Sequence, residues 1–163
     1  MITAFNLAGF FAAHAIWCVS DGEGLVPMFA HSGENDERQM ERLLAGDDLG
    51  ASVELGKNKL ESNEADANDG VLVYDGRIPV QGQKYDAIII EIRSYFSPAS
   101  KAVMAVPYKP AASGDFRVFK PKLLQWEECD DFDVNMVVQS FFEGVDAHEK
   151  GAEVWNRALD QSI

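Results

Sequence analysis

Apolar positions recur along the first part of the chain at a spacing that predicts a helix. From residue 4 to residue 19 they lie almost all round the helical axis, and Thr3 can cap the first turn. A helix that is apolar on every side is expected to lie inside a fold or at an interface. The short apolar segment 25–31 then predicts a strand, and Pro27 would suit a strand at the edge of a sheet.

Two further helices are predicted before residue 62. The first begins near Glu34, where Met40, Leu43 and Leu44 form one apolar stripe behind early acidic residues. The second has spacings of four, three and four along one face, which carries Leu49, Val53, Gly56 and Leu60. The polar segment 62–69 has the composition of a loop and ends this helical part.

The middle of the chain alternates between apolar runs and turn sequences, which predicts β-structure. Asp75-Gly76, inside residues 71–80, is a strong local hairpin signal, and residues 81–84 predict a second reversal. Short turns between neighbours favour an antiparallel meander, because parallel strands need long crossovers. The later strands are predicted at 85–96, at 101–108 and at 116–126, the last of them ending near Pro121.

Two helical patterns follow an acidic segment. Residues 134–145 carry a broad apolar face behind a candidate cap at Asp131 or Asp133, and residues 148–160 form the second pattern. No linker or internal repeat divides the sequence, so a single globular domain over residues 1–163 is predicted. The predicted fold class is α+β: an antiparallel meander sheet of about five strands, with N-terminal, central and C-terminal helices packed mainly on one face.

The charge balance of the chain restricts its partners. Asp and Glu number 27 against 14 Lys and Arg, which gives a net charge of −13 at pH 7. Such a surface repels phosphate backbones and anionic lipid headgroups, so neither nucleic acid nor a membrane is expected as a partner. It would suit a basic protein. The predicted contact is the acidic run, which we define as Glu127, Glu128, Asp130, Asp131 and Asp133.

Cysteine usage and the N-terminal segment bear on location and assembly. Cys18 and Cys129 form no C-x-x-C pair, and two cysteines in a chain of this length fit a reduced compartment. A signal peptide has a basic start, whereas no Lys or Arg precedes Arg38, so a cytoplasmic protein is expected. The three apolar helical segments exceed what one sheet face covers, which predicts a homodimer with a terminal helix in its interface.

The apolar strand 85–96 contains two opposite charges, Glu91 and Arg93. Side chains alternate along a strand, so both belong to one face, together with Tyr95. We expect this face to be the less buried one, because antiparallel sheets commonly leave one face in water. Glu91 and Arg93 would then pair with one another or with residues on neighbouring strands, in a purely structural role.

A second interpretation comes from Asp69, which lies twenty-two positions before Glu91. Asp69 and the later Glu91-Ile92-Arg93 are similar to the metal-dependent PD-(D/E)xK nuclease pattern, in which Asp and Glu hold a divalent ion and Lys assists the attacking water. The resemblance covers only about twenty-five residues. Asn68 stands in place of the family's proline, and Arg93 in place of its lysine, although a guanidinium cannot act as a base. The resemblance implies a Mg²⁺ site at Asp69 and Glu91, with Arg93 beside it.

Two functions therefore stay open. The sequence contains neither a G-x-S-x-G nucleophile motif nor the common nucleotide-binding signatures, and His14 lies among apolar neighbours, as core histidines do. These observations and the acidic surface favour a non-catalytic binding or regulatory module, with a basic protein as a partner. The alternative is a metal-dependent phosphodiesterase or nuclease-like enzyme that uses Asp69 and Glu91.

Overall fold

One mixed sheet organises the fold. The computed structural model describes residues 1–35 and 37–163, and its strands follow the order β2-β1-β3-β4-β5-β6-β8, with β7 also paired to β5. In chain order the elements are α1 (Ile2–Val19), β1 (Met28–Ser32), β2 (Arg38–Arg42), α2 (Leu49–Ser62), β3 (Asp69–Val80), β4 (Gln83–Ser94), β5 (Lys101–Lys109), the 3₁₀ turn η1 (Ala111–Ser113), β6 (Arg117–Phe119), β7 (Lys122–Glu127), α3 (Val134–Ala147), α4 (Glu149–Ala158) and β8 (Leu159–Asp160).

The centre of the sheet is a long hairpin formed by β3 and β4. The two strands pair without interruption, and the chain reverses at Gln81-Gly82, where both residues have positive φ angles of 50° and 82°. This is the backbone geometry that two-residue hairpin loops prefer. The predicted reversal within residues 81–84 is thus confirmed, whereas the hairpin at Asp75-Gly76 is wrong. Both of those residues lie inside β3 and pair with residues of β4.

The helix expected from Glu34 onward is also wrong, because residues 38–42 form strand β2. This strand pairs antiparallel with β1 and occupies the edge position that Pro27 seemed to indicate for β1. All five of its residues are exposed, and three are charged. Charged side chains on an edge strand oppose pairing with another chain. The next predicted helix is confirmed as α2, whose first turn is capped by Asp48 through the N–H of Ala51 at 3.1 Å.

The far side of the sheet departs from a simple meander. The segment predicted as one last strand forms β6 and β7 on either side of Pro121, and both pair antiparallel with β5. Strand β8 then pairs in parallel with β6. The α+β class is therefore confirmed. The antiparallel meander of about five strands is too simple a description, since the sheet is larger and contains a parallel pair.

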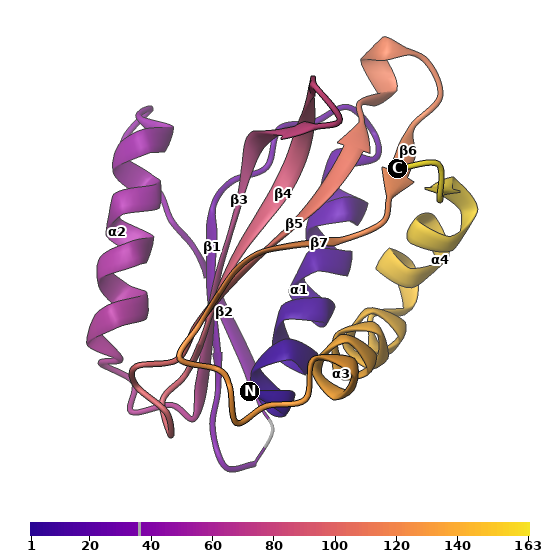
Figure 1. The fold of residues 1–163 in the computed structure, drawn as a ribbon. Helices are drawn as coiled ribbons and strands as arrows, with labels where there is room; N and C mark the ends of the chain where they lie inside the picture. Colours follow the sequence, from indigo (N-terminus) through magenta and orange to yellow (C-terminus); the bar gives the residue numbers. More distant parts are fainter. Residues whose placement is uncertain (36) are drawn as a thin grey trace.

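The helices cover both faces of the sheet (Figure 1). Helices α1, α3 and α4 share one face, where they form the larger core with strand residues such as Val71 and Ile90. Helix α2 lies alone on the opposite face, over a smaller core made of Phe29, Leu43, Leu60 and Leu72. Among the described elements the helices thus lie mainly on one face, as predicted, and the central helix is the exception.

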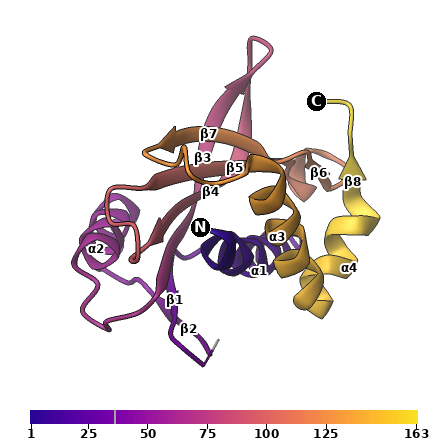
Figure 2. The same ribbon diagram turned by 60° about the horizontal axis from the view of Figure 1, so that its bottom comes forward.

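Helix α1 lies between the sheet and the two C-terminal helices (Figure 2). By length and composition alone this helix could cross a membrane. However, 61% of its residues are buried within the fold. Burial of that extent accounts for a helix that is apolar on almost every side.

Glycine allows α1 to approach α3 and α4 with direct backbone contact. A Cβ atom added at Gly9 would overlap the carbonyl group of Phe141, and one added at Gly144 would overlap the carbonyl oxygen of Asn6. A Cβ at Gly151 of α4 would overlap the carbonyl oxygen of Ala13 in the same way. These contacts leave no room for even the smallest side chain.

Candidate functional site

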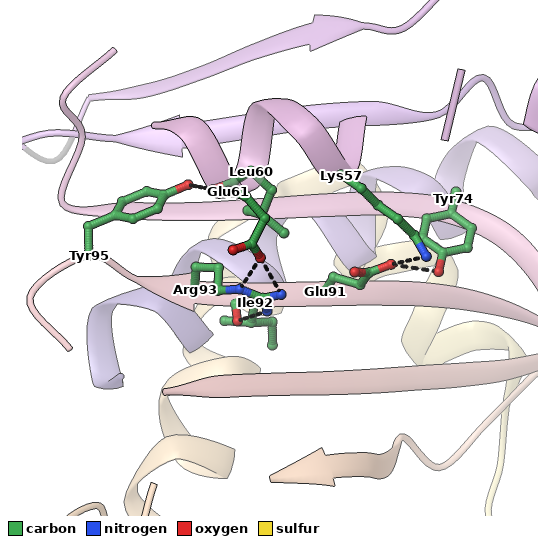
Figure 3. Close-up of polar contacts among 8 residues, drawn as sticks. All are labelled: Lys57, Leu60, Glu61, Tyr74, Glu91, Ile92, Arg93 and Tyr95. Atoms are coloured by element: carbon green, nitrogen blue, oxygen red, sulfur yellow. Dashed lines mark hydrogen bonds and ion pairs between the residues drawn. The ribbon is translucent and has the colours of Figure 1, made fainter. Parts of the chain in front are cut away.

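The first candidate site surrounds Glu91 on β4, beneath α2 (Figure 3). The hydroxyl of Tyr74 donates a hydrogen bond to Oε2 of Glu91 at 2.7 Å, and Nζ of Lys57 lies 3.7 Å from the same oxygen. Only 13% of the Glu91 side chain is exposed. Burial and the bond to Glu91 both raise the pKa of Tyr74, so the phenol stays protonated and acts as a donor.

Arg93 forms a separate contact with α2. Its Nε and Nη2 atoms donate to the same Oε1 of Glu61 at 2.9 and 2.7 Å, and Nη1 donates to the Ile92 carbonyl at 3.0 Å. Beside it, the Tyr95 hydroxyl donates to the Leu60 carbonyl at 2.6 Å, and burial raises the pKa of Tyr95 to about 12. Glu91 and Arg93 therefore do not pair with one another. Glu91 does bond to the neighbouring strand β3 through Tyr74, whereas Arg93 pairs with α2. Their face is the less buried one, as expected, although α2 covers much of it (Figure 3).

This polar network connects the sheet to α2. Figure 3 shows Lys57, Leu60 and Glu61 of the helix directed towards side chains of β3 and β4 and of the segment that follows β4. Each charged group in it already has an internal partner of opposite charge or a hydrogen-bond donor. Such groups hold the helix in place against the sheet.

Asp69 lies on the other side of the sheet from Glu91. Glu91 is paired directly opposite Leu72, which belongs to the smaller core under α2. Asp69 lies two residues before Val71, so both share the face that packs against α1. Asp69 is 2% exposed. The structure thus separates the two carboxylates by the sheet itself. Among the described residues, no group of three or more His, Cys, Asp and Glu side chains is placed to hold a metal ion.

We expect Tyr74→Phe to destabilise the protein by about 1.5 kcal/mol, because the largely buried carboxylate of Glu91 loses its closest donor. Urea unfolding followed by circular dichroism measures this change. The control is Tyr85→Phe, which removes an exposed hydroxyl bonded to Gln83 at 3.3 Å and should cost less than about 0.5 kcal/mol. Equal losses in the two variants would show that the bond to Glu91 contributes nothing specific.

The acidic run connects β7 to α3 and is fixed by its neighbours. Cys129 in its middle is buried, and its Sγ lies 3.1 Å from the Glu127 carbonyl. The Ser100 hydroxyl donates to the Glu128 carbonyl at 2.5 Å, and the Asp133 side chain caps α3 by accepting from the N–H of Asn135 at 2.9 Å. These contacts hold the backbone of the run against the fold.

The residues of the acidic run are exposed to solvent. All five residues are exposed, and within the described part of the chain none of them takes part in an ion pair. Some carboxylates elsewhere have partners: Glu41 lies 2.8 Å from Lys59, and Asp160 lies 2.7 Å from Arg117. The run is therefore a concentration of exposed negative charge without ion pairs among the described residues, on a fixed backbone directly before the first turn of α3.

A third arrangement joins the two ends of the chain. His14 of α1 and His148, the N-cap residue of α4, are 134 residues apart, and Nδ1 of His14 lies 3.0 Å from Nε2 of His148. Nδ1 of His148 accepts the backbone N–H of Gly151 at 2.9 Å. The rings of Phe10 and Trp17 flank His148 at centroid distances of 4.9 and 5.9 Å.

Sequence spacing could not have revealed this histidine pair. His14 and His148 lie on separate helices at opposite ends of the sequence, so no local motif contains both of them. The expectation of a core histidine described the apolar surroundings of His14 and missed its polar partner.

Comparisons of the chain with protein-family models, with curated proteins and with solved structures found no match.

Proposed function

We propose that this protein is a small cytoplasmic module without catalysis of its own, which binds a basic protein through the acidic run. The observation that carries the proposal is the concentration of five exposed carboxylates, without ion pairs in the described structure, on a backbone held in place by Cys129 and Ser100. Such a surface attracts Lys and Arg side chains before contact and orients the partner during approach. The unlinked cysteines Cys18 and Cys129 are consistent with a reducing compartment.

An apolar stripe on α3 extends the proposed surface. Val134, Val138 and Phe142 follow one another at spacings of four residues, and they are 43%, 37% and 38% exposed. Residues four apart lie on one side of a helix, so these side chains form a continuous strip that begins at the acidic run. The partner segment that fits this surface is amphipathic, with basic residues towards the run and apolar residues along the stripe.

The nuclease-like alternative lacks comparable support. A shared divalent ion needs ligands that converge on one point, whereas Asp69 and Glu91 belong to opposite faces of the sheet. Arg93 is engaged by Glu61 and by the Ile92 carbonyl.

A labelled amphipathic peptide of lysine and leucine tests the proposed surface by fluorescence anisotropy. The first variant neutralises the acidic run with Gln at the two Glu positions and Asn at the three Asp positions. The change Asp133→Asn keeps the cap of α3, because asparagine caps helices about as well as aspartate. We expect the dissociation constant of this variant to rise by at least about tenfold, and wild-type binding to weaken as salt screens the charges.

A matched control separates the acidic run from net charge alone. The control variant also loses five negative charges, at exposed positions that form no ion pair in the described structure, by substitution of Glu23, Glu34, Glu54, Glu64 and Asp115 with the corresponding amides. Its affinity should fall by less than about threefold. Equal losses in both variants, or unchanged binding in the first, would overturn the proposal.

Self-association remains a second proposal. Helix α1 is largely enclosed, so among the terminal helices the stripe on α3 is the surface that suits a homodimer. A dimer formed there would cover the apolar half of the partner surface, and peptide binding should then compete with dimerisation. Light scattering is expected to give twice the monomer mass at micromolar concentration. A mass near 18.0 kDa throughout that range would exclude the dimer.

A further inference from the structure

We infer that His14 and His148 form an acid-sensitive latch that holds the start of α4 against α1. Beside the backbone contact of Gly151 with Ala13, the hydrogen bond between these imidazoles joins the two helices, and the same His148 side chain caps the first turn of α4 through Gly151. One side chain, His148, thus both holds α4 against α1 and caps the first turn of α4. This inference does not depend on the proposed partner surface.

The hydrogen bonds fix where the protons lie at neutral pH. A backbone N–H can only donate, so Nδ1 of His148 must be an unprotonated acceptor for Gly151. The proton of a neutral His148 is then on Nε2 and is donated to Nδ1 of His14. His14 in turn carries its own proton on Nε2. Each ring is neutral, and the three groups form one directional chain.

An added proton breaks this chain wherever it binds. On His148 it must occupy Nδ1, where it faces the donating N–H of Gly151. On His14 it must occupy Nδ1, where it faces the N–H of His148. If His148 then carried its own proton on Nδ1, its Nε2 could accept from His14, but its Nδ1–H would face the N–H of Gly151. Two donors therefore meet in every singly protonated arrangement, and one hydrogen bond of the latch is lost.

The surroundings also oppose protonation. Burial lowers the pKa of His14, followed by the effects of His148 and Arg42, and burial is the first cause that lowers the pKa of His148. Arg38 and Lys150 add positive charge near His148. Cys18, one turn after His14, stays a neutral thiol, because burial raises its pKa. The charged groups that act on the pair from β2 and α4 are cations, while Asp21 and Glu23 of the segment after α1 line the same cavity as His14.

The sign of the pH dependence follows from the lowered pKa values. The unfolded chain takes up protons on its histidines near pH 6.5, while the folded latch takes them up only at lower pH. The contribution of the latch to the free energy of unfolding is therefore full above pH 6.5 and falls as the pH drops below it. Asp75 would give the opposite sign, because burial raises its carboxyl pKa and proton uptake then favours the folded state.

The experiment compares the wild type with His148→Asn, since Asn caps helices well and does not titrate in this range. Unfolding equilibria are measured in urea between about pH 7.5 and about pH 5.5, together with the NMR signal of the Gly151 amide. For the wild type we expect the unfolding constant to rise by up to about tenfold per pH unit for each proton taken up, with a parallel shift of the Gly151 signal. His148→Asn should weaken both responses and stay folded at the higher pH.

The third histidine of the chain, His31 of β1, supplies the control. His31→Asn should keep the pH response of the wild type. The inference would be overturned by an equal pH response in the wild type and in His148→Asn, or by a Gly151 amide signal that does not change below pH 6.5. A pH response lost in His31→Asn instead would assign the effect to β1 and would also contradict the latch.

Discussion

Gly144→Ala is expected to destabilise the protein by about 3 kcal/mol or more, the upper part of the range for overpacked positions. The added Cβ atom would overlap the backbone carbonyl oxygen of Asn6, which cannot move without displacing α1. In an isolated helix the same substitution would gain close to 1 kcal/mol, because alanine has the higher helix propensity. Urea unfolding followed by circular dichroism measures the difference.

Gly33→Ala is the matched control for this prediction. Position 33 has open space around a new Cβ atom, so the free energy of unfolding should change by less than about 0.5 kcal/mol. If Gly144→Ala were as stable as the wild type, α1 and α3 could not pack with direct backbone contact. A large loss in both variants would point to a general sensitivity of the fold and not to this helix crossing.

Trp155→Ala should cost about 3–5 kcal/mol, the usual range for deleting a large buried aromatic side chain. Trp155 is 2% exposed and packs edge to face against Phe141 and Phe142 at centroid distances of 6.2 and 6.4 Å. Its removal would leave a cavity between α3 and α4 that the rigid helices cannot close. Unfolding in urea is again followed by circular dichroism, because the substitution itself changes the tryptophan fluorescence.

Trp155→Phe keeps one ring in the same place and should cost clearly less than Trp155→Ala. The conservative variant separates loss of volume from loss of the whole contact. If the two substitutions had equal and small effects, α4 would not contribute to the larger core. In that case the burial of Trp155 against Phe141 would be without energetic consequence.

Sequence patterns predicted the elements whose burial is set by local periodicity. Helices α2, α3 and α4 and strand β4 each bury a regularly spaced set of residues, so a local reading identified them. Strand β2 could not be found this way, because all five of its residues are exposed and its pairing with β1 leaves no apolar period. Asp75-Gly76 misled for a related reason: continuous pairing along β3 overrode a strong local turn signal.

The candidate sites depended on which face each residue occupies and on which helix covers it. Alternation correctly placed Glu91 and Arg93 on one face, but it could not show that α2 would cover that face and bring Lys57 and Glu61 to them. It also gave no means of finding that Asp69 belongs to the other face, since that depends on the register between β3 and β4. The histidine pair required the packing of both chain ends and was beyond any local signal.

The position of α1 has a consequence for synthesis of the chain. This helix leaves the ribosome before the sheet and the other helices, yet the helices that enclose it end only at Ala158. At about 5–20 residues per second, its apolar surface must wait roughly ten seconds or more for its partners. The larger core is therefore complete only once α4 has been made, and a nascent chain stalled before α3 would expose the side of α1 that faces α3 and α4 to chaperones and to other copies of itself.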